Sequence, residues 1–403
     1  MNVEDFVRGS LKDLAVEQAA PAPGFADRVL AVRRRRRTRR LAAVAMAAAA
    51  VVAVSVAVPR LERDGRDDVR PSGVTGHQEQ SPPRDMIAVG RTVLAAYYTA
   101  RTVPVGKDRG VFERTYRLLN PGTGRYEKDD RWSFVAVAPG ARTAAVLERT
   151  LPAHRIGLLD LTTGEVERWI PVEQGVGGLA WSGDGKRLVA TTYDDHPDLR
   201  TRSLDEEGEP GGWMADRATS RTGFRLVDLP GGNGAWWKVT SGREVMSRAD
   251  FAFTRGDTGL YARVVGGKDG MEKFYDLSGA ETPAPANESH LRWDVPARLS
   301  PNGRLAAWGL SKEVDGDPGR SYSSIRDPLT GEEITKARGG TLVAWADDRR
   351  LIAWHRTTGL DGGYKDRLVL VTIGVDAVVP LSGERDPDED VDRQAWEPLF
   401  VDR

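Results

Sequence analysis

Beyond residue 135 the chain repeats a phrase in which an apolar residue precedes a short turn rich in Ser, Pro, Gly and Asp, and an apolar strand follows. Five copies begin at Val137, Trp181, Phe253, Leu299 and Trp345. Their starts are 44, 72, 46 and 46 residues apart. A period of about 40 to 50 residues is typical of one four-stranded blade of a β-propeller. The pattern therefore predicts a propeller.

A second phrase runs in step with the first and consists of an alternating strand that ends in Asp or Asn before a Gly turn. Alternation buries one face of a strand, and Gly, Asn or Asp supplies the positive φ that reverses the chain, so each copy predicts a hairpin. The key positions are Asn120, Asp160, Asp228, Asp276, Asp327 and, in a degenerate copy, Thr372. With a further copy of the first phrase from Ile87, the series predicts six blades, and seven remain an alternative.

The one long interval contains an insertion at residues 193–220, which is polar and lacks alternation. It predicts a long loop in the third blade. Near the other end, Ala395 to Val401 reads as a strand. Whether this strand joins the first blade, and so removes the open sheet edge, is not decided by the sequence pattern.

The copies LSPNGRLAAWGL and WSGDGKRLVATTY, followed by hairpins of the LLDLTTGE type, resemble TolB-like and WD-type β-propeller repeats. The resemblance covers about residues 85–403 and implies an all-β fold. It says little about activity, because propellers include both binding modules and enzymes.

Residues 41–58 carry no charge and read LAAVAMAAAAVVAVSVAV. Eighteen residues of helix reach about 27 Å, close to the roughly 30 Å of a bilayer core, so they predict one transmembrane helix. The arginines before it indicate a cytoplasmic N-terminus and an extracytoplasmic remainder at the cell membrane. These topology residues are Arg33, Arg34, Arg35, Arg36, Arg37, Arg39 and Arg40.

Three alternatives apply to this region. A signal peptide could be cleaved after Ala57, or Arg39 and Arg40 could belong to a twin-arginine export signal, although an n-region of about 40 residues is long for either. The arginine run could also contact nucleic acid or anionic lipid. Because it directly precedes the apolar span, we interpret it as a topology signal.

The remaining layout is a cytoplasmic segment (1–40) with two short helical patterns in residues 1–32, a charged flexible linker (59–84) and the propeller domain (85–403). This layout resembles uncharacterised actinobacterial-type membrane proteins, some of which accompany sigma factors. The resemblance implies a partner for residues 1–32. The chain departs from zinc-type anti-sigma factors, because it has no Cys for their His and Cys motif.

The amino-acid composition and the missing motifs exclude several kinds of functional site. A net charge of −1 gives no global field for nucleic acid. The absence of Cys excludes disulfides and thiolate metal sites, and the five His are scattered singly. No hydrolase elbow, phosphate loop or dinucleotide motif is present, so the sequence predicts neither a catalytic residue nor a cofactor.

Two sets of side chains remain as candidates for binding. Acidic clusters supply oxygens of the kind that Ca²⁺ prefers, although none forms a complete calcium loop. The metal candidates are Asp194, Asp195 and Asp198 in the insertion and Asp315 and Asp317 further on. The aromatic candidates are Trp213, Trp236 and Trp237, which do not fit the repeat register.

Three functions are consistent with these observations. The leading hypothesis is a membrane-anchored, non-enzymatic propeller that binds a protein, glycan or small molecule on one face, with the insertion at its rim. The second is a transmembrane regulator whose residues 1–32 bind a sigma factor or another cytoplasmic protein. The third is an extracytoplasmic hydrolase or lactonase.

Overall fold

The computed structural model describes residues 73–204, 210–216, 220–232, 234–239, 248–263, 272–314, 317–358, 363–387 and 393–403. Within these ranges the secondary structure is all-β, with antiparallel strands and no helix. The all-β prediction is therefore confirmed for the described part. The transmembrane prediction (41–58), the arginine run and the segment 1–32 lie outside the described residues.

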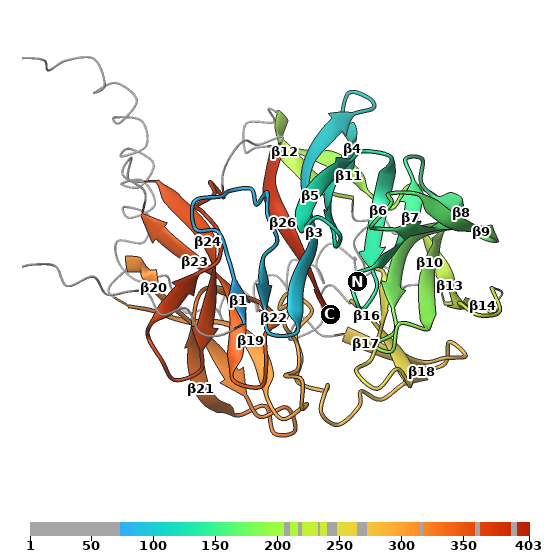
Figure 1. Cartoon of the computed structure of the whole chain (residues 1–403). Coiled ribbons are helices and arrows are strands. Elements are labelled where there is room, and N and C mark those ends of the chain that lie inside the picture. Colours follow the sequence, from blue (N-terminus) through green and yellow to red (C-terminus); the bar gives the residue numbers. More distant parts are fainter. Residues whose placement is uncertain are drawn as a thin grey trace, which may run out of the picture. The chain divides into compact units, whose positions relative to one another are not determined.

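The first sheet combines the beginning and the end of the domain (Figure 1). Its strands are β1 (Val74–Thr75), β2 (Ala88–Val89), β3 (Thr92–Pro104), β4 (Arg109–Asn120), β5 (Arg125–Asp129), β11 (Leu199–Leu204), β12 (Pro210–Ala215) and β26 (Arg393–Asp402). β26 pairs with β3 from Arg393↔Arg101 to Asp402↔Thr92. The C-terminal strand thus does join the first sheet, which the sequence pattern had not decided.

The second sheet has seven strands in the order β14-β13-β10-β9-β8-β7-β6. They are β6 (Trp132–Val137), β7 (Thr143–Glu148), β8 (Ala153–Asp160), β9 (Val166–Trp181), β10 (Arg187–Tyr193), β13 (Arg221–Asp228) and β14 (Trp236–Lys238). The long β9 is shared, because its first part pairs mainly with β8 and its last part with β10.

Three smaller sheets complete the domain. The third contains β15 (Phe251–Phe253), β16 (Gly259–Arg263), β17 (Glu272–Asp276) and β18 (Glu281–Thr282). The fourth contains β19 (Ala306–Val314), β20 (Asp317–Arg326) and β21 (Glu333–Arg338). The fifth contains β22 (Thr341–Trp345), β23 (Arg350–Thr358), β24 (Tyr364–Thr372) and β25 (Val378–Pro380).

The predicted hairpins form where the second phrase places them. At Asp160, which ends β8, the carboxylate accepts the backbone N–H groups of Thr162 (2.6 Å) and Thr163 (2.9 Å), and Gly164 follows with φ 72°. Asn120 and Asp327 accept equivalent bonds in their own turns. The side-chain oxygen accepts backbone N–H groups two or three residues further along the turn, which would otherwise need a backbone carbonyl. This is why Asp and Asn recur at these positions.

Hydrogen bonds at strand ends and turns connect each sheet to the next and return to the first, and one of them joins β6 to β9 within the second sheet. They are Gly140 N to Asp402 O (2.7 Å), Trp181 Nε1 to Ala136 O (2.8 Å), Gly183 N to Asp257 Oδ1 (2.9 Å), Arg255 to Pro301 O, Asn302 N to Asp348 Oδ1 (2.8 Å) and Thr92 Oγ1 to Trp345 O (2.7 Å). A closed succession of antiparallel sheets is the architecture of a β-propeller.

The insertion at 193–220 differs from the predicted loop. It contains β11 and β12, which form a hairpin, and β11 pairs with β4 through Leu199↔Val111, Arg200↔Gly110 and Thr201↔Arg109. The pairing uses backbone groups, and LRTRSL shows no alternation that would reveal a strand. The insertion therefore links the second sheet to the first.

Candidate ligand-binding cavity

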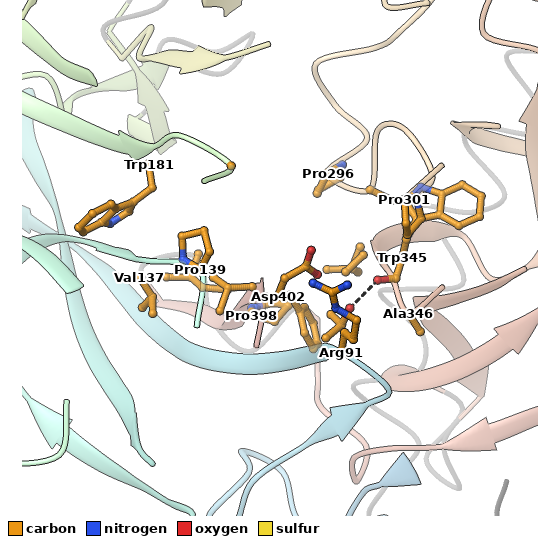
Figure 2. A pocket seen from close by; sticks show the side chains of 18 of the residues that line it. Arg91, Val137, Pro139, Trp181, Pro296, Pro301, Trp345, Ala346, Pro398 and Asp402 are labelled. Carbon is orange, nitrogen blue, oxygen red and sulfur yellow. Dashed lines mark hydrogen bonds between the residues drawn. The ribbon is translucent and has the colours of Figure 1, made fainter. Parts of the chain in front are cut away.

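A cavity of about 1230 Å³ is lined by β6, β9, β22 and β26 and by turns next to them. Phe134 to Val137 come from β6 and Leu179 to Trp181 from β9, and β22 contributes Thr341 and Val343 to Trp345. β26 contributes Glu397 to Asp402. Figure 2 shows this lining, with Trp181 and Val137 on one wall and Trp345 and Pro301 on another.

Strand alternation divides the lining side chains into buried and partly exposed ones. On β6, Val135 and Val137 are buried in the core, whereas Phe134 and Ala136 are partly exposed. All four residues line the cavity, and the less buried Phe134 and Ala136 lie on the strand face opposite Val135 and Val137. On β22, Val343 is likewise partly exposed where Leu342 is buried. The middle of the cavity is thus mainly apolar.

The mouth carries charges of both signs. Arg91, in the turn between β2 and β3, and Asp402, at the end of β26, are exposed, and both are labelled in Figure 2. Arg350 pairs with Asp347 at 2.6 Å, and a nearby carboxylate, that of Asp348, accepts the backbone N–H of Asn302. This rim can hydrogen-bond polar groups of a ligand whose apolar part lies deeper.

Arg385 is the principal polar group on the deeper wall. Its guanidinium lies 3.5 Å from the centre of the Trp354 ring and donates to Glu397 Oε1 at 3.0 Å. Its side chain is only 10% exposed. Stacking and pairing hold this cation in an otherwise apolar wall. The sequence analysis did not identify Arg385.

The insertion places Asp198 in a buried cluster of charges. The Asp198 side chain is 5% exposed and pairs with Arg114 of β4 (2.8 Å) and Arg248 (2.6 Å). Although burial opposes ionisation, the two guanidinium groups hold the pKa of Asp198 well below its ordinary value. Asp198 thus serves here as an anion in a salt-bridge network, not as an exposed ligand.

The other metal candidates are not brought together with Asp198. Asp194 and Asp195 are exposed, and Asp195 accepts the backbone N–H of His196. Asp317 begins β20, and Asp315 lies outside the described residues. Among the residues that the structure describes, no group of three or more His, Asp or Glu is placed to hold a metal ion.

The three tryptophans also lie apart from one another. Trp213 is on β12, where the Arg202 guanidinium stacks over it at 4.4 Å. Trp236 and Trp237 are on β14, and Trp236 Nε1 donates to Thr192 Oγ1 at 3.1 Å. None of the three lines the central cavity. Ligand binding by these residues remains a prediction.

The sequence analysis missed Arg114 and Phe134, and only Arg114 carries a signal in the sequence that could have revealed it. On β4, Arg114, Tyr116 and Leu118 are buried at alternate positions. A charged residue in the buried register of an apolar strand indicates a buried ion pair. Phe134 precedes the first repeated phrase by three residues and so falls outside the compared segments.

In the part of the chain that the structure describes, no helix is long and apolar enough to cross a membrane.

The geometry defines an all-β, propeller-like protein with a central cavity. No protein-family model matches the chain, and the comparison with curated proteins finds no match. Among solved structures it is similar to TolB from Acinetobacter baumannii (14% identity, TM-score 0.35), covering 71% of this chain and 65% of TolB.

Two further solved structures have similarly low TM-scores and sequence identities. A chain of a mitotic checkpoint complex is 12% identical with a TM-score of 0.37, and the match covers 87% of this chain and 99% of that one. Hydrazine synthase from Kuenenia stuttgartiensis is 12% identical with a TM-score of 0.35, with 61% and 65% covered. The chain therefore spans less than two thirds of TolB and of the hydrazine synthase chain.

Proposed function

We propose that this protein is a membrane-anchored, extracytoplasmic β-propeller of six blades that binds a ligand in its central cavity without catalysing a reaction. The single observation that carries the proposal is the cavity itself, with its apolar wall and its mouth of mixed charge. Such a cavity favours a small molecule, or a protruding part of a protein or glycan, that has an apolar body and polar ends.

The six-blade count is supported by the strand pairing. One blade is β26-β3-β4-β5, and the next two are the halves of the second sheet, divided within β9. The last three are the smaller sheets, of which the fourth gains an edge through the bridge Leu299↔Ala306. Each unit then has four strands or strand segments, as a propeller blade requires.

The cavity can be tested with the fluorescent probe 1-anilinonaphthalene-8-sulfonate, which has an apolar body and one anionic group. Ala136→Trp adds bulk at a partly exposed, cavity-lining position, whereas Ala280→Trp adds the same bulk at an exposed turn outside the cavity. We expect fluorescence titration to show at least about fivefold weaker binding for Ala136→Trp and wild-type binding for Ala280→Trp. Equal affinities of all three proteins would overturn the proposal.

The membrane anchor rests on residues 41–58 and the arginines before them. Protease treatment of intact cells and of inverted vesicles, with a tag at each end of the chain, tests it. We expect protease outside the cell to digest the C-terminal part while the N-terminal tag stays protected. A shortened protein released from the membrane would instead indicate a cleaved signal.

A further inference from the structure

The base of the cavity is the end opposite its charged mouth. Phe134 lies near the start of β6, whereas Pro139, in the turn after β6, lies at the mouth. From Phe134 to Val137 the strand rises by about 10 Å at about 3.3 Å per residue, and Pro139 follows in the turn beyond it. Phe134 therefore marks the base on this side of the cavity.

Two arginines cover the Phe134 ring. The Arg248 guanidinium lies 4.9 Å from the ring centre and that of Arg114 lies at 5.9 Å. Arg248 also donates to Gly177 O at 2.7 Å, in the β9 segment that begins the next unit. A cation placed over an aromatic face is attracted by the ring, so these contacts fix the position of Phe134.

The insertion provides the anion that holds both arginines together. Asp198 accepts bonds from Arg114 Nη1 (2.8 Å) and Nη2 (3.0 Å) and from Arg248 Nε (2.8 Å) and Nη2 (2.6 Å). Each carboxylate oxygen thus accepts two charge-assisted bonds. Without this carboxylate, two cations would face each other in a buried site.

A second carboxylate fixes Arg248 from the other side. Asp250 accepts Arg248 Nη1 at 2.8 Å and the Tyr193 hydroxyl at 2.7 Å. The packing is close, because a Cβ at Gly178 would lie 2.1 Å from Asp250 Oδ1. The cluster therefore joins β4, β6, β9 and the start of the insertion at the base of the cavity.

We propose that the start of the insertion, residues 194–200, forms a floor beneath Phe134 and that Asp198 is the positioning residue that keeps this floor closed. The inference deepens the proposed function, because a closed floor makes a ligand enter from the charged mouth. This role differs from the one predicted from the sequence, in which the insertion lies at the rim of the ligand-binding face.

The chain has no Cys, so a single introduced Cys reports access without background. Ala136→Cys places a thiol on the cavity wall two residues beyond Phe134, and Asp402→Cys places one at the mouth. Each is combined with Asp198→Asn or with the matched control Asp195→Asn, an exposed carboxylate of the same insertion. The full-length proteins are labelled with a bulky, charged maleimide.

We expect Asp198→Asn to raise the labelling rate at Ala136→Cys by at least about tenfold and to leave the rate at Asp402→Cys unchanged. Asp195→Asn should change neither rate. Unchanged labelling at Ala136→Cys in folded Asp198→Asn protein, or an equal rise at both sites, would overturn the floor. Should Asp198→Asn not fold, Arg248→Lys removes the bidentate bond while keeping the charge, and the same outcomes apply.

The labelling experiment needs no ligand. A floor that opens in Asp198→Asn together with unchanged dye binding in Ala136→Trp would support the floor and refute the binding function. Unchanged labelling in Asp198→Asn together with weaker dye binding in Ala136→Trp would refute the floor and leave the binding function supported.

Discussion

Trp396 on β26 should contribute more to stability than any exposed tryptophan, because it joins the last strand to the first sheet. The residue is 3% exposed, and its ring lies 5.5 Å from that of Tyr97 and 5.0 Å from that of Trp354. Its Nε1 donates to Ser81 Oγ at 3.1 Å. Trp396→Ala removes these contacts and leaves a cavity between the first and fifth sheets.

Substitutions of this kind cost about 3–5 kcal/mol of unfolding free energy. With a urea m value of about 3 kcal/mol/M, a loss of about 4 kcal/mol lowers the unfolding midpoint by more than about 1 M. Trp237→Ala is the matched control, because Trp237 is 36% exposed on β14 and should change the free energy by less than about 1 kcal/mol. Urea unfolding followed by circular dichroism measures both variants.

The reasoning fails if Trp396→Ala shifts the midpoint no more than Trp237→Ala. A further variant, Trp396→Phe, keeps an aromatic ring but loses the bond to Ser81, so its midpoint should lie between those of the wild type and Trp396→Ala. A Phe variant as unstable as the Ala variant would show that ring packing does not account for the effect.

Three further predictions concern single carboxyl groups. Asp160→Ala should cost about 1 kcal/mol in urea unfolding, since two backbone N–H groups lose their acceptor; no loss would mean that water replaces it. The pKa of Asp198 is lowered, so its contribution to stability is present above the unfolded pKa of about 4 and is lost as the pH falls further. The deficit of Asp198→Asn should therefore shrink between pH 7 and pH 2, and a constant deficit would contradict this. Burial raises the pKa of Glu272, so the wild type loses stability as the pH rises through that pKa, and Glu272→Gln should become more stable relative to the wild type over the same rise; a pH-independent difference between the two proteins would contradict this.

The repeated phrases predicted the parts of the fold that depend on local chemistry. Asp160 and Gly164 specify their turn through bonds to neighbouring residues, so the hairpin follows from a few consecutive residues. The alternation of Val135 and Val137 with Phe134 and Ala136 similarly follows from strand geometry. These features can be read along the chain without knowledge of distant contacts.

The buried charge cluster depends on distant contacts that no local pattern reports. Asp198 meets Arg114 across 84 residues and Arg248 across 50 residues. Sequence analysis could group Asp198 only with its neighbours Asp194 and Asp195, so it predicted an acidic loop. β11 was missed for the same reason, because its partner β4 belongs to a different sheet.

The pairing of β26 with β3 also sets the order in which the domain can fold. Ser81 and Trp396, which this closure brings into contact, are 315 residues apart in sequence. During synthesis, β3 emerges long before the strand that covers its free edge, and every intervening sheet is made first. Until β26 arrives, β3 exposes an unpaired edge to other chains.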